Sequence, residues 1–225
     1  MTANIDPSRP ILLTPSTPHH QTILAGIVHV HAHCILHDGT LATYLPPLSH
    51  SKMLSYWQAR LDQVRQGTRH IIVQLERVSS RTSSASDPIF AADDSSAPAP
   101  APTVRLSGSE HDHEHEYEVA GVVSLDKPDS ETGPFRAEVQ KLFTSPNHRR
   151  KGVARTVMGE LERCARADGR WSLLLDTTVG TDAEGMYPRF GYERMGVVKG
   201  YGISPVDGEL VDEVWFWKDL RTGAL

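Results

Sequence analysis

Three consecutive basic residues and a glycine, Arg149-Arg150-Lys151-Gly152, stand where a strand-like stretch changes into a helix-like one. The first amide N–H groups of a helix have no partners within it, and the helix dipole adds partial positive charge there. A glycine lets the backbone approach an anion closely, and the basic side chains add whole charges. The turn therefore suits a phosphate or pyrophosphate. An ordinary basic strand-to-helix turn is the alternative that the motif alone leaves open.

The elements on either side would hold this turn in place. The preceding stretch, from Arg136, mixes apolar and polar residues as a strand does. The following one has the apolar period of an amphipathic helix, with its stripe at Val153, Val157, Leu161, Cys164 and Ala165. Asp168-Gly169 would end this helix, because glycine readily adopts the left-handed conformation found after helix C-termini.

Histidines gather in two places, and each group has a metal-binding and a plain structural interpretation. The segment from Pro18 to Leu36 has a helical period, and His29 and His33 share one face of it. No partner ligands are evident, so we favour a polar or half-buried helix face over a metal site. The run His111 to Glu116 could bind zinc adventitiously, and a solvated charge run is the favoured interpretation. We predict no metal site.

Length and composition limit the class of protein. The 225 residues suffice for one domain with a substantial core, and a net charge of −5 argues against a nucleic-acid partner. We see no apolar run long enough to cross a bilayer and no secretory signal. Cys34 and Cys164 lie in apolar surroundings, which predicts buried free thiols, with a disulfide as the alternative. We expect a cytoplasmic protein, with the nucleus as an alternative.

The order of elements along the chain predicts the fold class. Strands are predicted at 11–13, 69–75, 118–125, from 136, and at 171–175, 192–203 and 211–217. Helices are predicted at 18–36, after the N-cap Ser49, from Val153, and at 183–190. This order predicts an α/β (α+β) fold with a mixed, mainly antiparallel central sheet flanked by helices. The repeated βαβ units and GxGxxG turn of a dinucleotide fold are missing from the sequence.

The whole chain, 1–225, is predicted to form a single domain in which three segments stand apart. We expect poor order in residues 1–10, which are polar and turn-rich. Residues 78–116 are rich in Ser, Ala, Pro and Asp, which predicts a low-complexity, disordered insertion between neighbouring strands. The apolar loop from Gly39 to Leu48 joins the first two helices, and it either covers a pocket as a lid or packs on the core.

These motifs and their order resemble the GNAT superfamily of acetyl-CoA-dependent N-acetyltransferases. Arg149 to Ala154 fits the family's Gln/Arg-x-x-Gly-x-Gly/Ala signature at all three specified positions, and Tyr187 to Tyr192 resembles its later Tyr-x-x-x-Gly-Phe element. Arg136 to Leu142, the Leu-Asp-Thr at 175–177 and the C-terminal pattern resemble the tabtoxin resistance group of small-molecule acetyltransferases. The resemblance covers about residues 116–220 well and the N-terminal third more weakly.

The resemblance implies acetyl-CoA as cosubstrate and gives roles to particular residues. The backbone of Leu142, Phe143 and Thr144 would hydrogen-bond the pantetheine arm like a neighbouring strand, and the amide of Phe143 would donate to the oxyanion. The pyrophosphate would lie on the basic turn, whose residues are Arg149, Arg150, Lys151, Gly152, Val153, Ala154 and Arg155.

Three side chains are candidates for the chemistry that the resemblance implies. Acetyl transfer needs a neutral amine, although a free alkyl ammonium has a pKa of about 10.4, and the departing thiolate benefits from a proton. Tyr187 would supply that proton as general acid, or would only anchor its short helix. Asp176 would take the proton of the amine, or would only cap the turn after its strand. Glu138 is the other candidate base.

Together these observations predict acetyl transfer from acetyl-CoA to a primary amine of a small molecule, by direct attack in a ternary complex. An amino-acid-like metabolite or toxin is the expected acceptor, and a detoxification role rests on the resemblance alone. Acetylation of protein lysines or N-termini, and non-catalytic acetyl-CoA binding, are the alternatives. A closed lid would favour a small substrate and an open groove a peptide. We expect no nucleic-acid or membrane partner, and Trp215 and Trp217 could pair the last strand in a homodimer.

Overall fold

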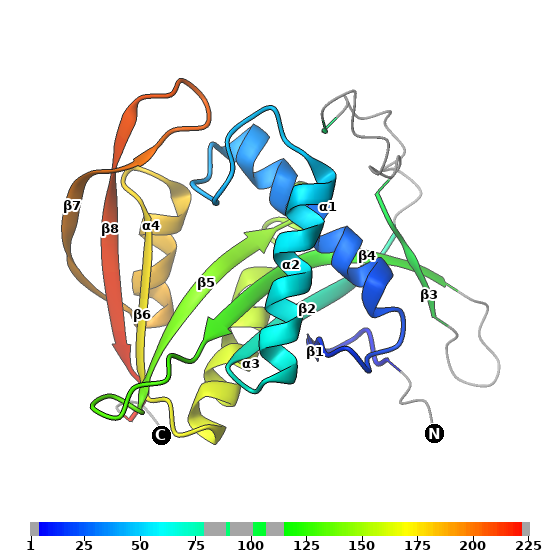
Figure 1. Cartoon of the computed structure of the whole chain (residues 1–225), viewed down its shortest axis with the longest axis horizontal. Coiled ribbons are helices and arrows are strands. Elements are labelled where there is room, and N and C mark those ends of the chain that lie inside the picture. The colour runs from blue at the N-terminus through cyan, green and yellow to red at the C-terminus, as the bar shows by residue number, and fades with distance from the viewer. Residues whose placement is uncertain (1–4, 79–88, 91–100, 107–114, 222–225) are drawn as a thin grey trace.

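The computed structural model describes residues 5–78, 89–90, 101–106 and 115–221, which form one eight-stranded sheet with helices around it (Figure 1). In chain order the elements are β1 (Ile11–Leu12), α1 (His20–Asp38), α2 (His50–Arg65), β2 (Arg69–Arg77), β3 (Val104–Leu106), β4 (His115–Asp126), β5 (Arg136–Thr144), the 3-10 helix η1 (Pro146–His148), α3 (Val153–Ala167), β6 (Ser172–Thr178), α4 (Asp182–Met186), the 3-10 helix η2 (Tyr187–Phe190), β7 (Glu193–Ile203) and β8 (Leu210–Asp219).

The strands lie in the order β1-β2-β4-β5-β6-β8-β7, and β3 pairs with β4 beside this path. Each pair of neighbours is antiparallel except β5 and β6, which are parallel because α3 crosses over the sheet between them. Helices α1 and α2 pack on one face and α3 packs on the other (Figure 1). The predicted mixed, mainly antiparallel sheet flanked by helices is therefore confirmed.

Alternation along the central strands builds a separate core on each face. In β2, Ile71 and Val73 pack in the core under α1 and α2, whereas Ile72 points to the α3 side. Helix α3 buries the stripe predicted for it against this second core, with Val157 and Leu161 fully covered. Each such side chain contributes about 1.5–3 kcal/mol when it leaves water. Both cysteines are buried free thiols, as expected.

Strand β5 carries a bulge that reverses its alternation midway. Lys141 and Leu142 together face a single residue of β4, Val123. Lys141 adopts a left-handed backbone conformation, with φ 56°, which costs a non-glycine residue roughly 1–2 kcal/mol. Because of the extra residue, Val139 packs on the α3 side and Phe143 packs on the α1 side.

Strands β5 and β6 stay together over only a short distance. Their parallel pairing covers Arg136 to Glu138 on β5 and ends at Leu174 on β6. Beyond that point the two strands separate, although β5 continues to Thr144 and β6 to Thr178. The sheet is therefore split in its middle, on the C-terminal side of both strands.

The predicted insertion, 78–116, lies largely outside the described residues, as do residues 1–4 and the part of the histidine–acid run before His115. The strands that it joins, β2 and β4, are neighbours in the sheet, as expected. Its described part contains β3, whose residues Val104 to Leu106 pair with β4. His115 and Glu116 are the first residues of β4.

Two local features differ from the sequence-based expectation. His29 and His31 of α1 are buried, with 5% and 0% exposure, because α1 is covered by both the sheet and α2. The helix predicted at 183–190 is α4 followed by η2, since Pro188 has no N–H for a continued α-helix.

Among the described residues, no three His, Cys, Asp or Glu side chains could together hold a metal ion. None of the described helices has the length and apolar character that crossing a membrane requires.

Candidate active site

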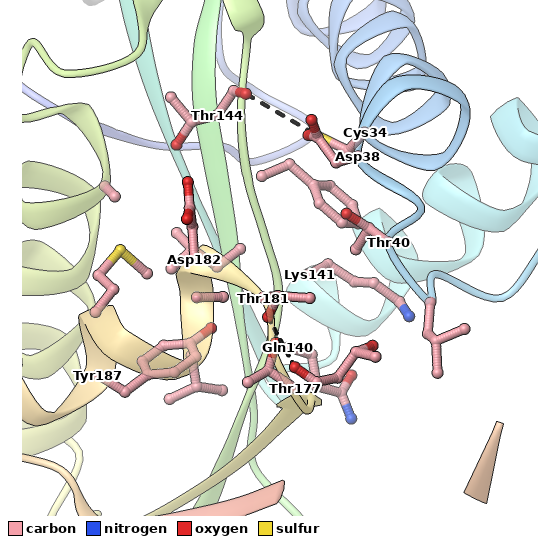
Figure 2. A pocket seen from close by; sticks show the side chains of 18 of the residues that line it. Cys34, Asp38, Thr40, Gln140, Lys141, Thr144, Thr177, Thr181, Asp182 and Tyr187 are labelled. Atoms are coloured by element: carbon pink, nitrogen blue, oxygen red, sulfur yellow. Dashed lines mark hydrogen bonds between the residues drawn. The ribbon is translucent and has the colours of Figure 1, made fainter. Parts of the chain in front are cut away.

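A cavity of about 1310 Å³ opens where β5 and β6 separate. Its walls come from β5, the turn before α3, the end of β6, the segment of α4 and η2, the connection between α1 and α2, and residues of α1, α2 and β8. Every predicted binding or catalytic residue lines this cavity except Lys151. Figure 2 shows side chains from these separate segments, among them Thr144, Thr177 and Tyr187, around one common space.

The turn before α3 lines the cavity and has the features of an anion-binding site. Gly152 is the N-cap of α3 and has φ 84°, and Arg150 has φ 59°. A Cβ placed on Gly152 would meet no atom within 4 Å, so the backbone faces open space here. The N-terminus of α3 has no side-chain cap, which leaves its first amides available to a ligand.

The basic side chains of the turn do different things. Arg149 forms an ion pair with Asp38, which ties the turn to the end of α1 and offsets one positive charge. Lys151 does not line the cavity, and its Nζ lies 3.4 Å from His148 Nδ1. The anion site therefore depends on backbone amides more than on the full run of basic side chains that the sequence suggests.

The second half of β5 presents an open backbone edge to the cavity, because it pairs with β4 on one side only. The amide of Ser145 donates to the carbonyl of Ala120 at 2.8 Å. Hydrogen-bonded pairs alternate along an antiparallel ladder, so this bond turns the amide of Phe143 toward β4 and those of Leu142 and Thr144 toward the cavity. An extended ligand could pair with such an edge as an added strand does.

Three carboxyl groups on strands line the cavity, those of Glu138 on β5, Asp176 on β6 and Glu213 on β8. Asp176 lies opposite Trp215 in the β6–β8 ladder and Glu213 lies opposite Thr178, so both acids project from the same face. Burial, together with the hydrogen bond and the negative charge of Asp176, raises the pKa of Glu213 to about 8. Glu213 therefore keeps its proton at neutral pH.

Glu213 is the candidate that sequence reasoning misses. The strand predicted at 211–217 places Trp215 and Trp217 on one face, and the same alternation places Glu213 there too. The signal in the sequence that could have identified Glu213 is an acid on the same face of the strand as the two tryptophans. Its closeness to Asp176 is not visible in the sequence, because that depends on which strand pairs with β8.

A chain of polar contacts holds Glu138 in position. Gln140 Nε2 donates to Glu138 Oε1 at 2.9 Å, and Arg69 Nη1 donates to Gln140 Oε1 at 3.0 Å. Arg69 is 4% exposed and pairs with Asp126 at 2.5 Å. A buried guanidinium with this many partners has little freedom, so Gln140 and Glu138 are held with it.

Tyr187 reaches the cavity from the α3 side of the sheet. It is the first residue of η2 and packs on Tyr192 and Phe216, with ring centroids 5.9 and 5.5 Å apart. Figure 2 shows its hydroxyl directed into the cavity. Burial, and then the negative charge of Asp176, raise the pKa of Tyr187, so this hydroxyl keeps its proton at neutral pH.

The α1–α2 loop, which lies beside the cavity, also contacts the β7–β8 hairpin. Leu41 of the loop lines the cavity. A Cβ built on Gly202 of β7 would lie 2.4 Å from Leu41 Cδ1, and one built on Gly39 would lie 2.9 Å from Val206 Cγ2. The loop that was expected to be either a lid or a core-packing connection does both: Leu41 lines the cavity, whereas Ala42 and Leu48 are buried in the core under α1 and α2.

His31 connects this loop to β5. Trp57 Nε1 donates to His31 Nδ1 at 3.1 Å, and His31 Nε2 lies 2.8 Å from the carbonyl of Ala42. Because Nδ1 accepts, the ring proton lies on Nε2 and is donated to Ala42. Burial lowers the pKa of His31 to about 3, so the ring is neutral, and it stacks on Phe143 with centroids 4.6 Å apart. The position of the loop is thereby coupled to β5.

Known proteins share both the sequence pattern and the fold. Residues 76–192 match the model of the acetyltransferase (GNAT) family. An N-acetyltransferase from Staphylococcus aureus has a TM-score of 0.59 at 12% identity, covering 94% of this chain and 99% of that one. A ribosomal-protein-alanine N-acetyltransferase from Brucella melitensis has 0.58 at 17% identity, with 89% and 96% covered.

A third solved structure is a GNAT phosphinothricin acetyltransferase from Sinorhizobium meliloti in complex with acetyl-CoA. Its TM-score is 0.58 at 16% identity, with 89% of this chain and 84% of that chain covered. At such identities these likenesses show the fold alone. The family match itself spans more than half of the sequence, and the chain therefore belongs to the GNAT family of acetyltransferases.

Proposed function

We propose that this protein transfers an acetyl group from acetyl-CoA to a primary amine of a small molecule, by direct attack in a ternary complex. The observation that supports this most is the single cavity at the split between β5 and β6. It joins an anion-binding helix N-terminus at one end to three carboxyl groups and a protonated tyrosine at the other.

The first end has the features that acetyl-CoA requires. Its pyrophosphate would accept hydrogen bonds from the first amides of α3, beside Gly152 and Arg150. Its pantetheine arm carries amide groups, which would pair with the open edge of β5 at Leu142 and Thr144. The thioester would then lie farther along β5, between Glu138 and Tyr187.

At the second end, the acids would make the amine nucleophilic. The amine arrives as an ammonium ion and must lose a proton before it attacks the thioester carbon. Glu138, or the pair of Asp176 and Glu213, would accept that proton directly or through water. When the carbon–sulfur bond breaks, Tyr187 would donate its proton to the departing thiolate. Burial raises the pKa of Tyr187, so the transfer of its proton to the thiolate is unfavourable unless burial also raises the pKa of the coenzyme A thiol.

The oxyanion that forms during attack needs a hydrogen-bond donor. We assign this role to the amide of Leu142 instead of that of Phe143. The ladder turns the Phe143 amide toward β4, whereas the Leu142 amide faces the cavity next to the bulge at Lys141.

The contact between the α1–α2 loop and the β7–β8 hairpin favours a small acceptor over a peptide. Contact between Leu41 and Gly202 narrows the path that an extended chain would need. The fold does not decide this point, because the similar structures include enzymes named for a ribosomal protein and for phosphinothricin. The second candidate is therefore acetylation of protein lysines or N-termini, and the third is non-catalytic binding of acetyl-CoA.

Release of free thiol from acetyl-CoA tests the proposal across a panel of small amines, amino acids and peptides with free lysines or N-termini. We expect kcat/KM to be at least about tenfold higher for the best small amine than for the best peptide. The opposite ranking would favour the protein acetyltransferase. Tight acetyl-CoA binding without turnover of any acceptor would favour the non-catalytic protein.

A further inference from the structure

Arg60 of α2 is a cation that lines the cavity without an acidic partner. It forms no ion pair within the part of the chain that the structure describes, although that part contains many. Its Nε is buried and has no hydrogen-bond partner there. Its guanidinium lies 3.8 Å from the centre of the Tyr56 ring, which also lines the cavity. The side chain is thus held by stacking, while its buried Nε has no hydrogen-bond acceptor among the described residues.

Arg60 lies at the acceptor end of the cavity and not at the anion-binding turn. Both Arg60 and Glu138 act electrostatically on buried Arg69, which belongs to the polar chain that holds Glu138. Glu138 and Thr144 are six positions apart along β5, which corresponds to roughly 20 Å of strand. The phosphates of acetyl-CoA, placed at the turn beyond Thr144, are therefore too distant to be the partner of Arg60.

The charges at this end fit a molecule that is both cationic and anionic. Glu138, Asp176 and Glu213 offer acceptors for an ammonium group. The guanidinium of Arg60 offers a planar fork of donors that matches the two oxygens of a carboxylate. Placing such a carboxylate here would also satisfy the buried Nε, whose lack of a partner is costly.

We infer that Arg60 binds a carboxylate of the acceptor, so that the substrate class is amines that also carry a carboxylate, such as amino acids. This inference rests on the proposed function, since it names the acceptor of that reaction. Arg60 acts on binding and specificity, and the bond-forming chemistry remains with the groups on β5, β6 and η2.

Matched pairs of acceptors, with and without a carboxylate, test this inference. The pairs are L-lysine with cadaverine, L-phenylalanine with phenethylamine, and L-methionine with 3-methylthiopropylamine. Each is measured by thiol release, and also by calorimetry on the protein saturated with coenzyme A, where no turnover occurs. For at least one pair we expect the amino acid to bind about 10- to 100-fold more tightly than its decarboxylated partner.

The variant Arg60→Gln should remove this preference. KM and Kd for the amino acid should rise about 10- to 100-fold, with kcat nearly unchanged and no effect on the decarboxylated partner. Arg60→Lys keeps the charge but loses the fork, so it should restore only part of the affinity. Arg65→Gln is the matched control, because Arg65 lies on the same helix but is solvent-exposed and paired with Asp62 at 3.0 Å.

The outcomes separate the inference from the proposed function. A wild-type protein that binds both members of every pair equally, or binds none, overturns the inference, as does a carboxylate preference that survives in Arg60→Gln. A preference that Arg60→Gln removes in calorimetry, without thiol release for any acceptor, supports the carboxylate site and overturns the proposed reaction. Unchanged Tm and acetyl-CoA affinity in Arg60→Gln would show that the variant is folded.

Discussion

The two ends of the cavity are built in different ways. The end at α3 uses backbone groups from one continuous stretch, β5 and the turn that follows it. The acceptor end uses side chains from β5, β6, β8, η2 and α2, which are far apart in the sequence. Backbone groups do not change with side-chain substitution, so one end can stay constant while the other changes its substrate. Under the proposed function, the protein would combine a general cofactor site with a particular acceptor site.

The largest effect should come from placing an acid at the backbone-built end. Gly152→Asp adds a negative charge beside the first amides of α3 and puts a side chain at φ 84°. We expect the Kd for acetyl-CoA to rise about 100-fold or more, measured by calorimetry. Gly159→Asp is the control, since Gly159 lies on the exposed side of the same helix with open space around it. Equal affinities in the two variants would remove the anion site from the turn.

A change at the reacting centre should separate turnover from cofactor binding. Tyr187→Phe keeps the packing on Tyr192 and Phe216 but removes the hydroxyl. We expect kcat to fall about 100-fold while the Kd for acetyl-CoA stays within about twofold. Tyr201→Phe, at an exposed position on β7, should change neither value. If Tyr187→Phe retains full turnover, the tyrosine is not the general acid.

The pH dependence should report the acid pair at the acceptor end. Glu213 keeps its proton up to a pKa of about 8, so the capacity of the pair to accept a proton, and with it kcat/KM, should rise as the pH approaches 8. Glu213→Gln should remove this rise and lower kcat/KM about tenfold, leaving any rise due to the amine itself. If the rise in kcat/KM near pH 8 persists in Glu213→Gln, another group causes it. The exposed acid Glu209 provides the control variant, Glu209→Gln.

Glu213 should also make the free energy of unfolding depend on pH. The pKa of Glu213 is raised from 4.5 to about 8 on folding, so the unfolded chain releases this proton at a lower pH than the folded one. The free energy of unfolding should therefore fall as pH rises from about 4.5 to 8, and denaturant titrations of Glu213→Gln should show a weaker fall. Parallel curves for the wild type and Glu213→Gln would contradict the raised pKa.

The smallest effect should come from disturbing the contact between the α1–α2 loop and β7. Gly202→Ala would place a Cβ 2.4 Å from Leu41 Cδ1, so the loop must shift. We expect KM for a small acceptor to rise about threefold, with unchanged affinity for acetyl-CoA. Gly196→Ala, on the same strand with open space around it, is the control. A larger effect on acetyl-CoA than on the acceptor would mean that the loop covers the cofactor end.

The difference between the two ends of the cavity also explains which parts of the fold and the site could be predicted from the sequence. The turn and the helix stripe from Val153 to Ala165 follow from local spacing, and so does the order of strands that gives the sheet. The bulge at Lys141 and the pair of Asp176 with Glu213 depend on strand register, which one sequence does not reveal. The burial of His29 and His31 depends on how α1 packs between the sheet and α2.

Following a labelled acetyl group tests most directly whether both ends act in one ternary complex. The protein is mixed with acetyl-CoA labelled in its acetyl group, with and without an amine that supports thiol release, and acceptor and protein are weighed by mass spectrometry. We expect label on the amine nitrogen only, and an unmodified protein when the amine is absent. Burial raises the pKa of Cys34 in the cavity wall to about 12, which disfavours it as a nucleophile. A labelled protein that passes its acetyl group to the amine would contradict direct attack.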